Sequence, residues 1–376
     1  MIEKIHIQNF KSIYDLELEV GRVNLVIGEN GSGKSNLLEA LVFVSAAESN
    51  KLDNEFLVSR GLRVPEPELM RSAFDEGKKE KDIEIDIYYD NNVNDKYNFS
   101  NTNETYSQWK VLTKLNHLIY QYEEDVNTIN EKDWHNLDGN GILSYLLDLK
   151  KMKSSIEFQD FIIYSPENTA LRIFQKEGQI QPLGINGEGL LKLLKVINSY
   201  EDKSYINTII ESLQLFNWFE DITIPLDISS LEDKVIIKDK YLYREFTQRS
   251  ANEGFLFILF YITLLVAKET PRAFAIDNID ASLNPKLCTK LMTILTDLAK
   301  KYDKQIFLTT HNPAILDGID LNDEEQKLFV VSRNKKGHTR MKEITAKDKP
   351  KSSDDEPLRL SEAFLRGYLG GLPKGF

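Results

Sequence analysis

The sequence predicts an α/β fold in which helices cover a mainly parallel sheet, with an antiparallel β portion at the amino terminus. Three observations predict this class. Apolar strand-like runs alternate with helical segments across residues 254–331, which is typical of a parallel sheet covered on both faces. A glycine-rich loop at residues 28–35 joins a buried strand to a helix. Residues 1–7 and 82–89 alternate apolar and polar side chains, as half-buried strands do.

The chain has 376 residues, which is enough for a large buried core and for two or three domains. Its formal net charge of −12 argues against a surface built for nucleic acid, because such a surface needs clustered lysine and arginine. The single cysteine, Cys288, excludes an internal disulfide framework and a cysteine-rich zinc site. The amino terminus lacks the layout of a signal peptide, so we expect a cytoplasmic protein. The longest apolar run, residues 255–267, is shorter than the roughly 20 residues that span a bilayer, so we expect a buried core helix and no membrane partner.

Residues 28–35 read Gly-Glu-Asn-Gly-Ser-Gly-Lys-Ser, which predicts a phosphate-binding loop. The glycines let successive N–H groups point at one small volume, Lys34 adds a positive charge, and Ser35 can reach a magnesium ion. The alternative is a glycine-rich turn that matches by chance, and the lysine, the serine and the flanking strand and helix argue against it. The residues expected to bind the nucleotide here are Asn30, Gly31, Ser32, Gly33, Lys34, Ser35 and Asn36.

The amino-terminal part is predicted to contain five strands and one long helix. The helix follows the phosphate loop to about residue 47, and the polar, proline-interrupted residues 49–81 are expected to be a connection. The expected strands lie at residues 1–7, 16–20, 23–27, 82–89 and 97–99, the last two as a hairpin.

The middle of the chain changes in character between residues 106 and 157. Long polar segments there carry apolar residues at helical spacing, beginning with Leu112, Leu115 and Leu118. We therefore expect an inserted helical arm at 106–157, and a discontinuous head made of residues 1–105 and 158–376. The arm is too short for a long coiled coil.

The rest of the head is predicted as strands and helices in alternation. The expected strands lie at residues 161–164, 222–226, 235–238, 241–243, 273–276, 305–310 and 327–331. The expected helices lie at residues 190–197, 206–218, 254–268, 285–300 and 358–368. Residues 347–357 are charged and carry two prolines, so they are expected to be a connection.

Residues 273–277 are four apolar residues followed by an aspartate. Buried strands often end in this way, but such a strand downstream of a phosphate loop is the form that delivers a carboxylate to magnesium. We therefore expect ATP and Mg²⁺ as cofactors, with Ser35 and Asp277 as the metal ligands.

Three further motifs follow the phosphate loop: residues 251–254 before an apolar helix, residues 277–285, and residues 309–313. In this order they resemble the ABC-type ATPase heads of the SMC, RecF and OLD-like group. Residues 7–12, Ile-Gln-Asn-Phe-Lys-Ser, are also similar to the start of such heads. The resemblance covers both ends of the chain and implies a P-loop NTPase fold of ABC-ATPase type.

The resemblance implies that ATP is held between two subunits. Asn252, Glu253 and Gly254 stand where the signature motif of the group meets the γ-phosphate bound by a partner subunit. Leu283 and Asn284 would lie in the loop that crosses this interface. A homodimer or a higher even oligomer is therefore expected.

The resemblance also implies roles for three polar side chains. Asp277 would hold magnesium, His311 would sense the γ-phosphate, and Lys11 would approach the phosphates. The simpler alternatives are a local hydrogen bond for His311 and a solvated side chain for Lys11.

Two residues depart from the family pattern. Asn278 occupies the place of the glutamate that orients or deprotonates the attacking water, and an amide cannot accept a proton, so help on the order of 10²–10⁴-fold is lost there. Asp280 is a candidate substitute. Asn252 stands where serine is usual, and its amide can still bond phosphate oxygens. The glutamine that normally adds a magnesium contact is left open among Gln108, Gln159, Gln175, Gln179 and Gln181.

Three functions follow from these observations. The first is a cytoplasmic ATPase with slow hydrolysis that dimerises on ATP and regulates a separately encoded effector, a nuclease or toxin, in DNA repair or defence against phage. The second is a scaffold that binds ATP without turnover, which Asn278 favours. The third is the energy-coupling subunit of a membrane transporter, against which the roughly 220 residues between Lys34 and Gly254 argue. Nucleic-acid binding stays open, because the acidic balance opposes it and the resemblance favours it.

Overall fold

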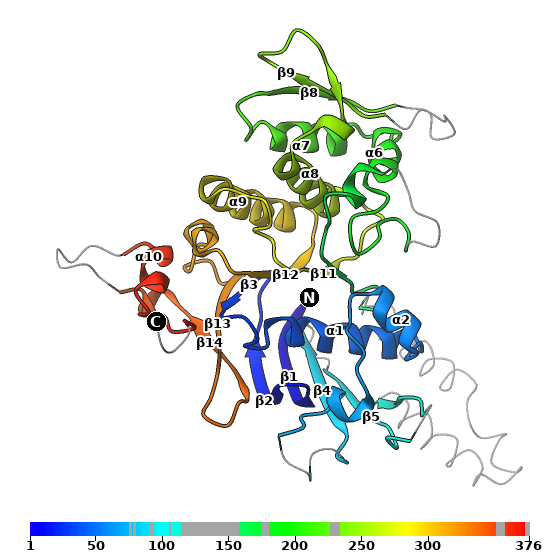
Figure 1. Ribbon diagram of the computed structural model, residues 1–376, viewed down its shortest axis with the longest axis vertical. Helices are drawn as coiled ribbons and strands as arrows, with labels where there is room; N and C mark the ends of the chain where they lie inside the picture. Colours follow the sequence, from blue (N-terminus) through cyan, green and yellow to red (C-terminus); the bar gives the residue numbers. More distant parts are fainter. Residues whose placement is uncertain are drawn as a thin grey trace, which may run out of the picture.

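The computed structural model describes residues 1–74, 77, 80–90, 94–104, 107–113, 158–173, 180–225, 234–350 and 358–372. In this part of the chain a long helix lies between two sheets, and further helices cover the far face of the larger sheet (Figure 1). This layering confirms the predicted α/β class. Among the described residues, none of the helices combines the length and the apolar character that crossing a bilayer requires.

The larger sheet has six strands. They are β3 (Val23–Gly28), β7 (Ile163–Tyr164), β11 (Ala273–Ile276), β12 (Gln305–Thr310), β13 (Gln326–Arg333) and β14 (Thr339–Ile344). Their order is β14-β13-β3-β12-β11-β7, and only β14 runs antiparallel to its neighbour. The parallel strands predicted from apolar runs are confirmed. Strand β14 was not predicted, because its sequence Thr-Arg-Met-Lys-Glu-Ile is largely polar and lies at an edge of the sheet.

The smaller sheet is antiparallel, as predicted for the amino-terminal portion. Its strands are β1 (Ile2–Phe10), β2 (Ile13–Glu19), β4 (Ile83–Tyr89), β5 (Asn94–Ser100) and β6 (Lys110–Thr113), in the order β2-β1-β4-β5-β6. Alternation along β1 and β4 buries one face, including Ile5, Ile7 and Ile85. The hairpin predicted from residues 82–89 and 97–99 is confirmed.

The first residues of the predicted helical arm form a strand, so the predicted start of the arm is wrong. Leu112 was expected on a helix, but it lies in β6, opposite Asn98 of β5. Pairing with the edge of the sheet gives the backbone groups of residues 110–113 hydrogen-bond partners and packs Val111 against the core. These interactions favour a strand here, although the apolar residues farther along have helical spacing. Residues 114–157, which include Leu115 and Leu118, lie outside the described residues, so the arm stays a prediction.

Helix α1 (Lys34–Glu48) lies between the two sheets. It is buried along nearly its whole length, because one side contacts the smaller sheet and the other contacts the larger one. Val26 and Phe307 of the larger sheet face this layer, whereas Leu25 and Leu308 face the opposite side. The alternating directions of the strand side chains therefore divide the core into two halves.

Four helices cover the far face of the larger sheet: α6 (Leu190–Asn198), α7 (Ser204–Leu213), α8 (Glu253–Val266) and α9 (Pro285–Lys301). Helix α8 is apolar on all sides and buried along its length, which confirms the predicted core helix. A small sheet of β8 (Phe219–Thr223), β9 (Ile236–Asp239) and β10 (Phe246–Thr247) lies beyond these helices in Figure 1. Helix α10 (Leu360–Leu365) lies within the region predicted as a helix at 358–368.

Two short regions differ from their predictions. Residues 49–81 contain α2 (Asn54–Ser59) and α3 (Pro67–Met70) in place of a plain connection, because Asp53 caps the first helix and Pro67 begins the second. Residues 241–243 form an exposed turn rather than a strand, and β10 follows instead. Short 3-10 helices lie at residues 170–172, 248–250, 313–318 and 346–348.

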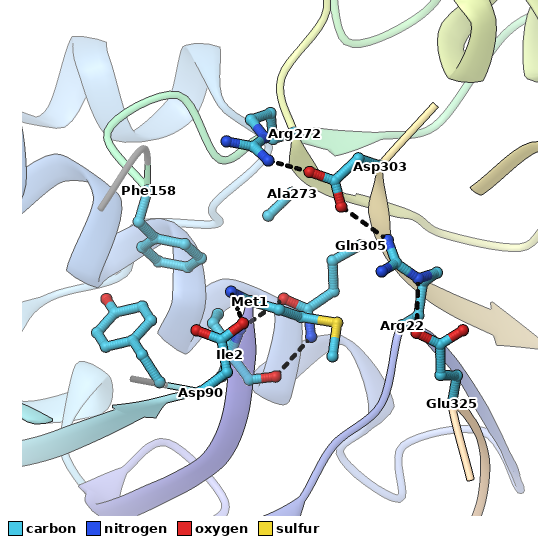
Figure 2. A pocket seen from close by; sticks show the side chains of 11 residues that line it. Met1, Ile2, Arg22, Asp90, Phe158, Arg272, Ala273, Asp303, Gln305 and Glu325 are labelled. Atoms are coloured by element: carbon cyan, nitrogen blue, oxygen red, sulfur yellow. Dashed lines mark hydrogen bonds and ion pairs between the residues drawn. The ribbon is translucent and has the colours of Figure 1, made fainter. Parts of the chain in front are cut away.

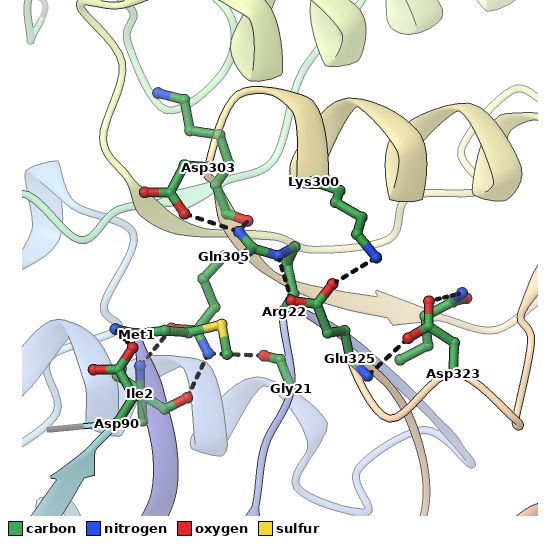
Figure 3. A network of polar contacts seen from close by, with 12 residues as sticks. Met1, Ile2, Gly21, Arg22, Asp90, Lys300, Asp303, Gln305, Asp323 and Glu325 are labelled. Atoms are coloured by element: carbon green, nitrogen blue, oxygen red, sulfur yellow. Dashed lines mark hydrogen bonds and ion pairs between the residues drawn. The ribbon is translucent and has the colours of Figure 1, made fainter. Parts of the chain in front are cut away.

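Gln305, at the start of β12, joins the two sheets. Its buried amide oxygen accepts a hydrogen bond from the Ile2 backbone N–H at 2.9 Å. Its amide nitrogen donates to the carbonyl oxygens of Ile2 (2.8 Å) and Gly21 (2.7 Å), as Figure 3 shows. A single side chain therefore satisfies three backbone groups where the sheets meet.

Ion pairs surround this junction at the amino ends of the parallel strands. Arg22 pairs with Asp303 and Glu325, each at 3.1 Å, and Asp303 also pairs with Arg272. Figure 2 shows these side chains beside Phe158 around a hollow of about 360 Å³. The phosphate loop lies at the opposite, carboxyl edge of the sheet, because it follows the last residue of β3.

Candidate nucleotide-binding site

The phosphate loop connects β3 to α1, as predicted. Gly31 (φ 74°) and Gly33 (φ 106°) have left-handed backbones that favour glycine. Lys34 is the first residue of α1, and its buried Nζ donates to the carbonyl oxygens of Gly28 (2.9 Å) and Glu29 (3.0 Å). The loop thus curls around the ammonium group of its own lysine.

Ser35 and Asp277 are brought together at the carboxyl edge of the sheet. Ser35 Oγ donates to Asp277 Oδ2 at 3.4 Å, and Thr309 Oγ1 donates to Asp277 Oδ1. Burial lowers the pKa of Lys34, and the nearby carboxylate of Asp277 opposes that shift. The cation of the loop, its hydroxyl and the strand-end carboxylate therefore form one cluster.

The cluster can hold Mg²⁺ only if a bound nucleotide supplies further oxygen ligands. No group of three or more histidine, cysteine, aspartate or glutamate side chains in the described ranges could hold a metal ion. Ser35 and Asp277 supply two oxygen ligands, and Mg²⁺ commonly combines one or two carboxylates with phosphate oxygens and waters. The pair is therefore suited to a metal that arrives with a nucleotide.

Asn278 and Asp280 lie in the turn after β11. Asn278 has a left-handed φ of 56°, which asparagine adopts more readily than most residues, and its backbone N–H donates to Thr309 Oγ1 at 2.9 Å. Asp280 Oδ1 accepts hydrogen bonds from Thr310 Oγ1 (2.6 Å) and from the His311 backbone N–H (3.3 Å). In the described part of the chain Asp280 Oδ2 has no such partner. The bonds to Oδ1 therefore orient the carboxylate and leave Oδ2 able to accept a proton.

His311 follows β12 and lies within electrostatic range of this cluster. Loss of solvation and the charge of Lys34 lower the pKa of His311 below its usual value of 6.5, while Asp280 and Asp277 oppose the shift. The imidazole is therefore neutral at pH 7, with one ring nitrogen as a donor and the other as an acceptor. It lies near Lys34, Asp277 and Asp280, and its role as a sensor of the γ-phosphate stays a prediction.

The predicted signature residues lie at the amino end of α8. Asn252 caps this helix, because its Oδ1 accepts a hydrogen bond from the Phe255 backbone N–H at 2.8 Å. A Cβ on Gly254 would lie 3.1 Å from the carbonyl oxygen of Ser282, next to Leu283. Within the described ranges, no hydrogen bond joins residues 252–254 to residues 28–36 of the same chain. The signature residues thus lie beside the predicted interface loop and are not bonded to their own phosphate loop.

Lys11 is held by a buried carboxylate. Its Nζ pairs with Glu39 and donates to the Arg63 carbonyl oxygen at 2.7 Å, while Arg63 Nε donates to Glu39 Oε1 at 2.6 Å. Burial lowers the pKa of Lys11, and Glu39 opposes the shift. Its predicted contact with phosphates stays a prediction.

Three further residues reach the loop, and the sequence did not single out two of them, Thr339 and Arg333. Ser12, which lies in the turn before β2, hydrogen-bonds Asn36 and Thr339, and Arg333 Nε donates to the Gly31 carbonyl oxygen at 2.7 Å. Lys11, Arg63 and Arg333 line a hollow of about 600 Å³ beside Asn36. Sequence motifs could not have identified Thr339 or Arg333, because they are about 300 residues away and belong to no signature.

The described residues do not identify which glutamine candidate reaches the site. The Asp277 backbone N–H donates to the Tyr164 carbonyl oxygen at 2.8 Å, so the residues that follow β7 lie at the same edge as Asp277. Gln159 precedes β7, and its carbonyl oxygen accepts hydrogen bonds from Ser45 and Ser49 of the α1 region. Gln175 and Gln179 lie outside the described residues, Gln108 precedes β7, and Gln181 lies 17 residues beyond the end of β7. The position of this glutamine therefore stays open.

A phosphate loop beside a strand-end aspartate, on a sheet of this order, defines a P-loop ATPase with the head architecture of SMC and RecF proteins. The family model described as "AAA domain, putative AbiEii toxin, Type IV TA system" matches residues 23–317. Since this match covers most of the chain, the chain belongs to that family of AAA-domain, ATP-binding proteins.

Two kinds of curated sequence are similar to the chain. It is 30% identical over 166 residues to the uncharacterised protein MJECL10 of Methanocaldococcus jannaschii, an alignment that covers 42% of this chain and 70% of that one. It is 42% identical over 55 residues to the DNA replication and repair protein RecF of Listeria welshimeri, and 47% identical over 51 residues to RecF of Porphyromonas gingivalis. These matches cover 14% and 13% of this chain and only 15% and 14% of the RecF chains.

Solved SMC heads share the fold. The head bound to the C-winged helix domain of ScpA matches with a TM-score of 0.57 and 14% identity, over 92% of this chain and 98% of that one. The head with an extended coiled coil bound to the C-terminal domain of ScpA, from Pyrococcus furiosus, matches with a TM-score of 0.50 and 13% identity, over 92% and 96%. These likenesses establish the ABC-type head architecture of this chain.

Proposed function

We propose that this protein is an ATP-dependent switch. It binds Mg-ATP at residues 28–36, dimerises by holding ATP between two copies, and regulates a separately encoded effector, a nuclease or toxin, in DNA repair or defence against phage. The observation that carries the proposal is the cluster of Lys34, Ser35 and Asp277, which combines a phosphate-binding cation with two magnesium ligands.

The surroundings of the loop support a bound nucleotide. The Ser32 hydroxyl is buried and has no hydrogen-bond partner within the described part of the chain, so it is available to a phosphate oxygen. The hollow lined by Lys11, Arg63 and Arg333 continues past Asn36, where the chain from the phosphates to the base would run. We assign the ribose and base of ATP to this hollow.

The location of the signature residues supports a second copy as the partner. The amino end of the 14-residue helix α8 offers free backbone N–H groups and a positive dipole end, both of which favour a phosphate. Asn252 is exposed there and Gly254 lets another backbone approach closely. A γ-phosphate held by a second copy would complete both half-sites at once.

Hydrolysis in this proposal is slow. Asn278 cannot accept a proton, and we take the free oxygen of Asp280 as the candidate base near the cluster. The second candidate function, a scaffold that binds ATP without turnover, is favoured by the same asparagine. A phosphate-release assay on the purified protein separates them: turnover at an ordinary ATPase rate removes the scaffold, and tight binding without turnover supports it.

The effector remains part of the proposal. The two similar SMC heads were solved with a domain of a second protein, ScpA. By analogy, closure of this head on ATP would create or remove a surface for its own effector, and nucleic acid is a further candidate partner. A cytoplasmic location agrees with this role.

The Lys34→Ala variant tests the proposal. Loss of the ammonium group should abolish ATP binding, measured by calorimetry, and ATP-dependent dimerisation, measured by light scattering. Lys290→Ala, which removes an exposed lysine from α9, serves as the matched control and should bind and dimerise as the wild type does. Unchanged ATP binding by Lys34→Ala would overturn the proposal.

A further inference from the structure

We propose that Thr339, Ser12 and Arg333 are positioning residues that hold the phosphate loop in the shape that binds ATP. The proposal rests on the ATP binding proposed above, and goes beyond it by assigning a role to the β13–β14 hairpin. Thr339 begins β14 and Arg333 ends β13, so both flank the turn that lies against the loop. Thr339 is buried, and Arg333 is exposed.

The hydrogen atoms of this contact can be assigned by counting. Thr339 Oγ1 donates its hydrogen to the Ser32 carbonyl oxygen at 2.8 Å. The 2.6 Å bond between Ser12 Oγ and Thr339 Oγ1 must therefore use the hydrogen of Ser12. Ser12 Oγ in turn accepts a hydrogen bond from Asn36 Nδ2 at 2.6 Å. The result is one directed chain of hydrogen bonds from Asn36 through Ser12 and Thr339 to Ser32.

This chain of bonds joins the middle of the phosphate loop to the first turn of α1. Asn36 lies in the first turn of α1, and Ser32 lies before the helix starts, so the bonds span Gly33, Lys34 and Ser35. The Thr339 backbone N–H also donates to the Ser12 carbonyl oxygen at 2.8 Å, which holds the two hydroxyl-bearing residues together. All three hydroxyl-bonded residues, Ser12, Ser32 and Thr339, are buried, so water does not compete for these bonds.

The consequence for phosphate binding follows from the planarity of the peptide bond. In a trans peptide the C=O and the following N–H point in opposite directions. Thr339 holds the Ser32 carbonyl outward at 2.8 Å, so the Gly33 N–H is directed inward. Arg333 holds the Gly31 carbonyl at 2.7 Å, and the N–H of the same peptide, on Ser32, donates to the Glu29 carbonyl oxygen at 3.3 Å. The hairpin thereby aims the Gly33 N–H into the loop, where a phosphate would lie, and fixes the peptide before it.

The glycine at position 33 is explained by the same contact. Its φ of 106° is left-handed, and a Cβ there would overlap Thr339 Oγ1 and lie 2.7 Å from Ser12 Oγ. In contrast, a Cβ on Gly31 would meet no atom within 4 Å. The side chains of Thr339 and Ser12 therefore leave no room for a Cβ at Gly33, which directly precedes α1, whereas the space at Gly31 is open.

The test is the affinity for ATP of Thr339→Val, which keeps the shape of threonine and removes the hydroxyl. The variant leaves the Ser32 carbonyl without its side-chain donor and the hydrogen of the Ser12 hydroxyl without its acceptor, and it frees the peptide to turn. We therefore expect the Kd for ATP to rise about tenfold or more at a temperature well below the melting point. Thr339→Ser restores the hydroxyl and should restore the affinity. Thr263→Val is the matched control, since it removes a buried threonine hydroxyl that donates to the Leu259 carbonyl oxygen in α8.

A second variant keeps the proposal testable should Thr339→Val fail to fold. Arg333→Met removes the bonds from an exposed side chain to the carbonyl oxygens of Gly31 (2.7 Å) and Gly337 (3.3 Å) and should weaken ATP binding several-fold, without loss of the folded state by circular dichroism. If Thr339→Val, or Arg333→Met in its place, binds ATP as the wild type does, the positioning role is wrong. If Thr339→Val and Thr263→Val lose affinity equally, the effect is one of general stability and the role is also wrong. If the wild type itself binds no ATP, the failure lies in the proposed function.

Discussion

Ser35 Oγ lies 3.4 Å from Asp277 Oδ2, although 242 residues separate the two in sequence. We therefore predict that Asp277→Asn removes the dependence of ATP binding on Mg²⁺. The amide keeps the shape of the side chain but is a poorer ligand for a hard cation. Calorimetric titration of ATP with and without Mg²⁺ measures this directly. In the wild type Mg²⁺ should tighten binding, whereas in the variant the two titrations should agree.

Asp297→Asn is the control for this experiment, because it changes an exposed aspartate on α9 by the same chemistry. It should retain the Mg²⁺ effect in full. A Mg²⁺ effect of wild-type size in Asp277→Asn would show that the metal is held elsewhere.

Asn278→Glu should raise the rate of phosphate release. A carboxylate next to Asp277 would supply the general base that the asparagine lacks, and such a base is worth about 10²-fold or more. The left-handed backbone at this residue costs a glutamate about 1 kcal/mol, so the melting temperature should fall slightly. Asn278→Gln carries the same backbone cost without a base and should hydrolyse ATP no faster than the wild type. Equal rates for the glutamate and glutamine variants would exclude this position as the site of the base.

Asp280→Asn addresses the residual activity. If Asp280 is the base in the wild type, its amide variant should lose the remaining phosphate release while still binding ATP, measured side by side. Thr310→Val should lower the rate less, because it removes one of the two bonds that orient the carboxylate and leaves the carboxylate itself. A fully active Asp280→Asn protein would assign the residual activity to another group.

The pKa of His311 gives a pH-dependent prediction. Lys34 and loss of solvation hold this pKa below 6.5, so the unfolded chain binds a proton at higher pH than the folded chain does. The contribution of His311 to stability is therefore present above pH 6.5 and is lost as the pH falls toward the lowered pKa. In a histidine NMR titration, Lys34→Ala should move the pKa of His311 upward, because a nearby positive charge is removed. Lys290→Ala should leave it unchanged, and a downward shift in Lys34→Ala would contradict the geometry.

Gln305 allows stability to be separated from nucleotide binding. Gln305→Leu leaves the backbone groups of Ile2 and Gly21 unpaired at the junction of the sheets, which should lower the free energy of unfolding by about 3 kcal/mol in urea denaturation. The affinity for ATP should not change, because the junction lies at the opposite edge of the sheet. Gln214→Leu, at an exposed glutamine, is the control. A loss of ATP affinity in Gln305→Leu would mean that the two edges are coupled.

Local sequence patterns predicted those elements whose structure is decided by residues close to one another in the sequence. The apolar runs of β3, β11 and β12 and the alternation of β1 and β4 are signals of this kind, and each element formed where expected. Leu112 shows the limit, because pairing with an existing sheet edge decided its structure. Strand β14 shows a second limit, since a polar edge strand carries little pattern of its own.

The same division applies to the site. Lys34, Ser35, Asp277, Asp280 and His311 could be named because motifs mark them, and the structure brings them together. Thr339 and Arg333 could not, because their role arises from a tertiary contact with backbone atoms. The left-handed backbone at Asn278 also required coordinates, and it gives a conformational reason for asparagine beside the catalytic one.

The hydrogen bond between Ser12 and Thr339 closes a loop of 327 residues. During synthesis from the amino terminus, the phosphate loop emerges before the hairpin that contacts it, which lies about 300 residues later. Strand β13, which pairs with β3 next to the loop, arrives only shortly before it. Until the hairpin has been made, the phosphate loop therefore lacks the contacts that Thr339 and Arg333 make with it.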